Sequence, residues 1–188
     1  MIINEDWYSD VQIAELGKIV ESVKGLQGLF IEIGCWEGKS TIKIANTLYP
    51  MILHAVDTWE GNINEDPNHI TVKTLKIRDV FSVFKQNIQT DTQGNIKIFK
   101  MDCFDYLEKV NEPITLCHID ASHNYEDVKK TIEMALPFVI KGGVLCGDDI
   151  SSANINRTDL NGGVERAVKE LLPGYTQIGN FWYWRKNA

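Results

Sequence analysis

Three aspartates and one histidine stand where two strand-like apolar runs end. Asp120 closes the first of these runs and His123 follows three residues later, whereas Asp148 and Asp149 close the second. Carboxylates that lie close together raise each other's pKa values, and a divalent cation such as Mg²⁺ removes that cost. The pattern predicts a metal site beside a histidine that could take a proton from a bound hydroxyl. The alternative is that one aspartate caps a helix and another is solvated.

A glycine turn follows the apolar run 29–34. It reads E-I-G-C-W-E-G (32–38), with its two glycines four positions apart. A Walker-type phosphate loop needs one more residue between its glycines, and the dinucleotide fingerprint needs a glycine where Trp36 stands. Trp36 would block a pyrophosphate, and the two glutamates would repel one. The turn is therefore predicted to hold a ligand without phosphates, and its acids favour one that carries positive charge.

Acids also follow the next two strand-like runs. Asp57 could accept hydrogen bonds from both hydroxyls of a ribose, which would account for a nucleoside without a pyrophosphate. Asp102 could receive the exocyclic amine of an adenine, with Phe104 packed nearby. Each residue also has a structural interpretation: Asp57 as a loop or capping acid, and Asp102 as the N-cap of the helix that follows it.

Alternating strand and helix patterns must position these residues. The early strand patterns are continuous apolar runs, typical of strands buried on both faces of a parallel sheet. The alternation predicts an α/β fold with right-handed crossovers, whose ligands lie beyond the carboxyl ends of the strands. We expect strands at 29–34, 52–57, 95–100, 114–120 and 142–149, helices at 9–25, 39–49, 73–89, 103–110, 125–139 and 163–172, and a hairpin at 175–186.

Composition narrows the function classes. The chain has 188 residues, 44% of them hydrophobic, and a formal net charge of −7. These values predict a single soluble domain over 1–188, with the helical segment 1–26 packed on it. The acidic balance argues against nucleic acid, and no apolar run reaches the roughly 20 residues that cross a membrane. The N-terminus lacks a signal-peptide pattern, so we expect a cytoplasmic protein with mostly buried cysteines.

The motifs together resemble the class I S-adenosylmethionine-dependent methyltransferases. Within that class they look like the macrocin O-methyltransferase-like enzymes that modify sugars and other small molecules. The resemblance covers about residues 25–170 and implies a Rossmann-like methyltransferase fold, with a seven-stranded, mostly parallel sheet, an antiparallel last strand and helices on both faces. It rests on E-x-G-x-x-x-G (32–38), D-T-W-E-G (57–61), I-D-A-S-H-N-Y-E-D-V (119–128) and G-G-V-L-C-G-D-D (142–149).

The resemblance also implies cofactors and roles. It implies S-adenosyl-L-methionine as the methyl donor, and Mg²⁺ or another divalent cation held by Asp120, Asp148 and Asp149. His123 and Asp120 are the implied catalytic residues, and His123 stands where catechol-type enzymes carry a lysine. The residues implied to bind the methyl donor are Glu32, Gly34, Cys35, Trp36, Gly38, Ser40, Asp57, Thr58, Trp59, Asp102, Cys103 and Asp120.

We therefore expect an O-methyltransferase that acts on a hydroxyl of a small molecule. The polar segments 58–72 and 150–162 suggest a sugar or polyol, and Arg157 could meet an acidic group on it. Two alternatives stay open: a metal-independent methyltransferase, and a domain that binds S-adenosylmethionine without catalysis. A nicotinamide-linked dehydrogenase is disfavoured by Trp36. The expected partner is a hydroxylated acceptor, without nucleic acid or membrane, and a homodimer could complete the site.

Overall fold

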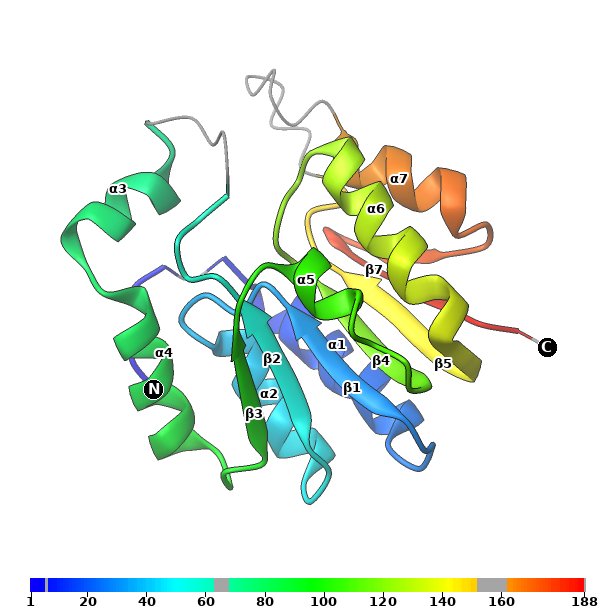
Figure 1. Cartoon of the computed structure of the whole chain (residues 1–188), viewed down its shortest axis with the longest axis horizontal. Helices are drawn as coiled ribbons and strands as arrows, with labels where there is room; N and C mark the ends of the chain where they lie inside the picture. Colours follow the sequence, from blue (N-terminus) through cyan, green and yellow to red (C-terminus); the bar gives the residue numbers. More distant parts are fainter. Residues whose placement is uncertain (6, 63–67, 152–161, 188) are drawn as a thin grey trace.

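The computed structural model describes residues 1–5, 7–62, 68–151 and 162–187. Its strands are β1 (Leu29–Ile33), β2 (Leu53–Asp57), β3 (Ile96–Lys100), β4 (Ile114–Ile119), β5 (Val139–Gly147), β6 (Thr176–Ile178) and β7 (Phe181–Arg185). They form one sheet in the order β3-β2-β1-β4-β5-β7-β6 (Figure 1). Strands β1 to β5 are parallel, and β7 pairs antiparallel with both β5 and β6. This architecture confirms the predicted fold class, including the antiparallel last strand.

Helices cover both faces of the sheet. Side chains alternate between the two faces along each strand. Phe30 therefore packs on the side of α1 (Asp10–Val23) and α2 (Lys39–Leu48), where α4 (Val80–Asp91) also lies. Its neighbour Ile31 belongs to the core on the opposite face. That face is covered by three further helices: α5 (Cys103–Leu107), α6 (Tyr125–Ala135) and α7 (Gly163–Leu171).

The helix expected over 73–89 is wrong in its extent, because two helices occupy this region. Helix α3 (Ile70–Ile77) ends where Arg78 adopts an extended backbone, and α4 starts at Val80. The side chain of Asp79 accepts a hydrogen bond from the backbone N–H of Ser82 at 3.0 Å. Aspartate favours such a capping position over a helix interior, so the break follows from local chemistry.

The boundary between α6 and β5 also differs from the prediction. The helix expected over 125–139 ends at Ala135, and a 3-10 turn spans Leu136–Phe138. Pro137 lies in this turn, where it needs no backbone N–H donor. Strand β5 then begins at Val139, so the glycine pair at 142–143 lies inside the strand and not at its start.

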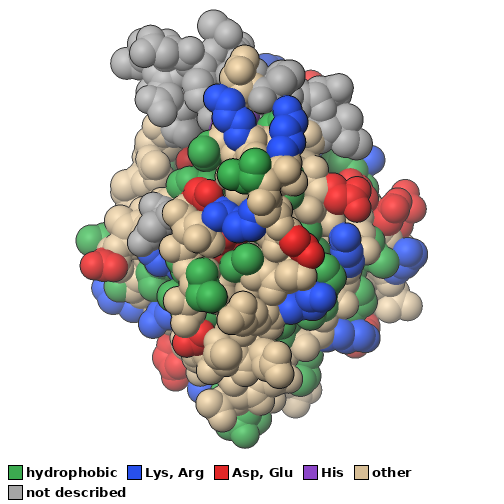
Figure 2. Space-filling model, turned by 90° about the vertical axis from the view of Figure 1, so that its left-hand side faces the viewer, with side chains coloured by type: hydrophobic (Ala, Val, Ile, Leu, Met, Phe, Trp, Pro, Cys, Tyr) green, Lys and Arg blue, Asp and Glu red, His purple; other side chains and the backbone are tan. Residues whose placement is uncertain are grey.

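The cysteines follow the expected pattern. Three of the four cysteines are buried, Cys103 is half-buried, and all four are free thiols. On the face seen in Figure 2, acidic, basic and hydrophobic side chains are interspersed. Among the described residues, no helix is both long enough and apolar enough to span a bilayer.

Candidate functional site

Backbone strain is concentrated at the carboxyl edge of the sheet. Trp36, Trp59 and Asp149 have positive φ angles of 47°, 54° and 60°, and no other non-glycine residue in the described ranges has one. Each lies just beyond a strand, after β1, β2 and β5 respectively. Such conformations cost on the order of 1–3 kcal/mol each and gather at functional sites. This edge is therefore the candidate site, as expected for a parallel sheet.

The turn after β1 lies against the end of β4. Gly34 has a φ of 83°, and a Cβ atom there would lie 2.0 Å from the carbonyl oxygen of Asp120. Only glycine allows this approach, because any side chain would overlap the backbone of the neighbouring strand. The first glycine of the predicted turn thus brings the two strand ends together, whereas Gly38, also at positive φ, is the residue before α2.

Asp57 joins the turns after β1 and β2. Its Oδ2 accepts hydrogen bonds from the backbone N–H groups of Cys35 (2.7 Å) and Trp36 (3.0 Å), and its Oδ1 accepts one from Trp59 (2.7 Å). Burial raises the pKa of Asp57, although these N–H groups oppose the shift. A carboxylate has about four acceptor positions, so capacity for about one further donor remains. The side chain therefore holds the backbone here and has less capacity for two ribose hydroxyls than the sequence suggested.

The side chain of Trp59 packs in the interior and does not face a ligand site. Its ring is buried against Phe81 and Phe84, with centroids 4.6 and 4.7 Å away, and its Nε1 donates to the carbonyl oxygen of Trp36 at 2.9 Å. Of the other predicted donor-binding residues here, Cys35 and Ser40 are buried and Thr58 is half-buried. A ligand at this turn would therefore meet mainly backbone.

Glu32 is fully buried beneath this edge. Its Oε1 lies 3.2 Å from Nδ1 of His118, which is also fully buried. Among the described residues, neither carboxylate oxygen has a hydrogen-bond partner of good geometry. Burial alone would lower the pKa of His118, but Glu32 and the strand-end aspartates raise it. A buried carboxylate is costly without compensation, so this position favours a positively charged neighbour.

The strand-end acids form a cluster with His123. One ligand atom each from Asp120, His123 and Asp149 lie within 4.8 Å of one another. His123 Nε2 is 2.9 Å from Asp149 Oδ2. Burial and then the charge of Asp149 raise the pKa of Asp120, while His118 and His123 oppose the shift. Two carboxylates and an imidazole at this spacing fit a divalent cation.

Asp148 occupies a different position from the one predicted. Its side chain is 6% exposed, and its Oδ1 accepts a hydrogen bond from Nε2 of Gln12 at 2.6 Å. Burial, followed by the charges of Asp120 and Asp149, raises the pKa of Asp148 to about 7. The structure thus brings His123 together with Asp120 and Asp149, and turns Asp148 toward α1.

Asp102 begins α5 at the end of β3. Its Oδ1 accepts a hydrogen bond from the backbone N–H of Phe104 at 2.8 Å, which confirms the predicted N-cap. Asp102 and the half-buried Cys103 lie at the same sheet edge as the turns after β1 and β2. An adenine-binding role for them stays a prediction.

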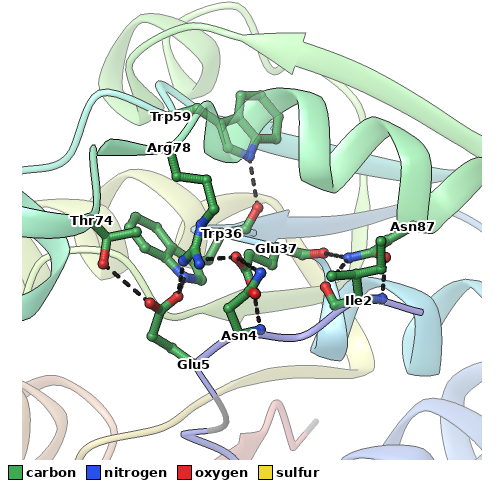
Figure 3. A network of polar contacts seen from close by, with 9 residues as sticks. All are labelled: Ile2, Asn4, Glu5, Trp36, Glu37, Trp59, Thr74, Arg78 and Asn87. Carbon is green, nitrogen blue, oxygen red and sulfur yellow. Dashed lines mark hydrogen bonds and ion pairs between the residues drawn. The ribbon is translucent and has the colours of Figure 1, made fainter. Parts of the chain in front are cut away.

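The N-terminal segment is the part of the site that the sequence analysis missed (Figure 3). The backbone N–H and Nδ2 of Asn4 donate to the carboxylate of Glu37 at 2.6 and 2.8 Å. Arg78 lies 2.9 Å from the same carboxylate and also pairs with Glu5, which accepts a hydrogen bond from Trp36 Nε1 at 3.3 Å. The available sequence signal was the S-x-x-Q capping box at 9–12, which marks the start of a helix directly after a tryptophan and a tyrosine.

Comparison with known proteins decides the family. A family model described as a methyltransferase domain matches residues 31–150, more than half of the 188 residues. The chain belongs to the methyltransferase domain family. The matched range contains every residue predicted to bind the methyl donor or the metal or to act in catalysis, and the segment before residue 31 lies outside it. The prediction of a methyltransferase is confirmed at this level, whereas the macrocin-like subfamily stays a prediction.

Solved structures share the fold of this methyltransferase. An O-methyltransferase from Bacillus cereus in complex with SAH is 17% identical, with a TM-score of 0.68 over 98% of this chain and 84% of that one. TomG from Streptomyces achromogenes, an O-methyltransferase in complex with SAM, is 18% identical, with a TM-score of 0.69 over 96% and 82%. CalS11, a TDP-rhamnose 3'-O-methyltransferase, is 17% identical, with a TM-score of 0.61 over 93% and 79%. No curated protein matches the chain in sequence.

Proposed function

We propose that this methyltransferase carries the methyl group of S-adenosyl-L-methionine to a hydroxyl oxygen of a small molecule, assisted by a divalent cation. The observation that carries the proposal is the cluster of Asp120, His123 and Asp149 at the same sheet edge as the turn 34–38. Support also comes from the fold, which the chain shares with O-methyltransferases solved in complex with SAH and with SAM.

The buried charge of Glu32 suits the methionine end of the donor. Its carboxylate oxygens have no hydrogen-bond partner of good geometry among the described residues, and a ligand ammonium nearby would offset their burial. Asp57 would accept one ribose hydroxyl, and Asp102 with Cys103 would border the adenine. The remaining predicted residues would contribute mainly backbone around the donor: Gly34, Cys35, Trp36, Gly38, Ser40, Thr58 and Trp59.

The strand-end cluster would carry out the proton transfer. A cation held by Asp120 and Asp149 would lower the pKa of an acceptor hydroxyl. His123 would accept that proton on the ring nitrogen that does not face Asp149, and Asp149, whose Oδ2 lies 2.9 Å from Nε2, would stabilise the imidazolium. The acceptor oxygen then bonds to the methyl carbon as the carbon–sulfur bond breaks, and the sulfur keeps the electron pair. Asp148 would join the cation only after its side chain leaves Gln12.

A sugar or polyol is the acceptor class that we propose. The segments 58–72 and 150–162 are polar, and CalS11, which shares the fold, is a TDP-rhamnose 3'-O-methyltransferase. Residues 63–67 and 152–161, including Arg157, lie outside the described part of the chain. Three predictions from the sequence stay predictions: that the protein forms a homodimer, that it is cytoplasmic, and that it binds no nucleic acid.

Calorimetry with S-adenosyl-L-homocysteine (SAH) tests the donor site. We expect micromolar binding to the wild-type chain and at least tenfold weaker binding to Glu32→Gln, which removes the negative charge. Transfer of a radiolabelled methyl group to a panel of nucleotide sugars, polyols and catechols, with Mg²⁺ or with EDTA, then tests the acceptor and the metal. Turnover that EDTA leaves unchanged would favour the metal-independent alternative. Binding without turnover on any hydroxylated acceptor would favour the non-catalytic one.

A further inference from the structure

The start of α1 reaches two of the strand-end acids. Tyr8, which is 8% exposed, donates its hydroxyl hydrogen to Asp120 Oδ2 at 2.6 Å, and the same hydroxyl lies 3.2 Å from His118 Nε2. One helical turn later, Gln12 donates from Nε2 to Asp148 Oδ1 at 2.6 Å. Two acids from different strands therefore accept neutral donors from one short segment.

The sheet register explains why these acids face α1. In the parallel ladder Glu32 lies beside His118, and His118 lies beside Cys146, so the three side chains share the face covered by α1 and α2. Asp120 and Asp148 come two residues after His118 and Cys146, directly beyond the ends of β4 and β5, and their contacts to Tyr8 and Gln12 lie on this same face. Asp149 is one residue beyond Asp148 and has a positive φ, which brings it to His123.

Contacts other than the one to Asp120 fix the position of Tyr8. The Trp7 ring lies against the Trp36 ring with centroids 5.3 Å apart, and Lys39 Nζ donates to the carbonyl oxygen of Tyr8 at 2.7 Å. Directly after Tyr8, Ser9 and Gln12 form a capping box at the start of α1. The backbone on both sides of Tyr8 is thus held by contacts that do not involve its hydroxyl.

A neutral donor has a specific effect on a carboxylate. The Tyr8 hydroxyl occupies one acceptor position of Oδ2 and fixes the rotamer of Asp120, but it leaves the negative charge in place. The carboxylate is then presented to His123 and Asp149, its partners in the cluster. Hydrogen bonds that orient metal-binding carboxylates typically change metal affinity or activity on the order of 10- to 100-fold.

We propose that Tyr8 is a positioning residue, whose hydroxyl holds the Asp120 carboxylate toward Asp149 in the orientation that binds a divalent cation. The inference rests on the proposed function and deepens it. It extends the site to the segment before residue 31, which the family model does not cover.

Mn²⁺ binding measured by electron paramagnetic resonance tests this inference on the full chain, with and without SAH. Tyr8→Phe keeps the buried ring and deletes the hydroxyl. Tyr49→Phe is the matched control, because Tyr49 is 49% exposed just after α2, at the opposite edge of the sheet. We expect the Kd for Mn²⁺ to rise about 10- to 100-fold in Tyr8→Phe and less than about twofold in Tyr49→Phe. SAH binding should stay within about threefold in both variants.

A second substitution separates orientation from stability. Tyr8→His keeps a ring N–H donor near Asp120, so it should bind Mn²⁺ more tightly than Tyr8→Phe when both show the same thermal unfolding midpoint. Equal Mn²⁺ affinity in Tyr8→Phe and the wild type would overturn the inference, as would a wild-type chain that binds no Mn²⁺. A wild-type chain that binds Mn²⁺ but not SAH would instead refute the methyl-transfer proposal. The role of Tyr8 would then still be decided by the Mn²⁺ affinities of Tyr8→Phe and the wild type.

Discussion

Replacing Arg78 by methionine should destabilise the chain far more than the loss of a surface ion pair would. Arg78 lies 2.9 Å from Glu37, whose side chain is 1% exposed, and also contacts Glu5, whose side chain is 15% exposed. Arg78→Met keeps most of the side-chain length but leaves two acids facing each other without a cation. Removing one partner of a buried pair costs about 3–5 kcal/mol. Because Arg78 itself is 24% exposed, we expect about 2–4 kcal/mol.

Urea unfolding followed by tryptophan fluorescence measures this loss in the free energy of unfolding. Thermal unfolding gives a second measure: for a chain of 188 residues, 1 kcal/mol corresponds to about 2–4 °C in Tm, so the variant should lose roughly 5–15 °C. Lys18→Met is the control, because Lys18 pairs with Glu15 at 2.5 Å while its side chain is 70% exposed. That variant should lose about 0.5 kcal/mol or less.

A double-mutant cycle identifies the interaction responsible. The double variant with Glu37→Gln and Arg78→Met should lose much less free energy of unfolding than the sum of the two single losses. The reason is that Arg78→Met leaves the Glu37 carboxylate without its cation, and Glu37→Gln removes that charge. If the two costs added within about 0.5 kcal/mol, the pair would not be coupled. If Arg78→Met cost no more than Lys18→Met, the network between the N-terminal segment and the turn 34–38 would not exist in solution.

Two further outcomes follow from the site, and a third from His54 within β2. Asp57→Asn keeps the shape but weakens three charge-assisted contacts to backbone N–H groups, so SAH affinity should fall at least tenfold by calorimetry; unchanged affinity would exclude a role at the donor. His123→Ala should lower kcat/KM about 10²- to 10⁴-fold while SAH affinity stays within threefold, and equal losses in both would mark His123 as a binding residue. Burial, and then the charge of Lys97, lower the pKa of His54 in the folded chain below its ordinary value of about 6.5. Below about pH 6.5 the unfolded chain therefore binds more protons than the folded chain, and the free energy of unfolding falls as the pH drops. His54→Gln should therefore lose less stability than the wild type between pH 7 and pH 5, and a parallel profile would contradict this sign.

The strands and the strand-end acids were predictable because their signals are local. Each early strand is a continuous apolar run, and the acids stand directly after those runs, so their common edge follows from parallel topology alone. The break at Arg78 was missed because the apolar spacing continues across it, and the cap from Asp79 decides the boundary. Gln12 and Tyr8 were missed for another reason: they lie 136 and 112 positions away from the acids that they contact. No local pattern encodes such a contact, which depends on how α1 is placed against the finished sheet.

Charge balance at the sheet edge restricts what can bind there. Arg78 compensates Glu37 and Glu5, and His118 faces Glu32. Asp57, Asp120 and Asp148 differ, because their hydrogen bonds in the described part of the chain come from backbone N–H groups, a tyrosine hydroxyl and a glutamine amide.

Neutral donors orient a carboxylate without cancelling the charge of its ionised form. Burial raises the pKa of all three acids, that of Asp148 to about 7, so the edge becomes more negative as the pH rises above 7. A nucleotide phosphate would add to that charge. A sulfonium compound with an ammonium group, or a divalent cation, would offset it. The hydrogen-bond pattern thus favours a positively charged ligand at this edge over a phosphate, which is the charge that the proposed methyl donor and cation carry.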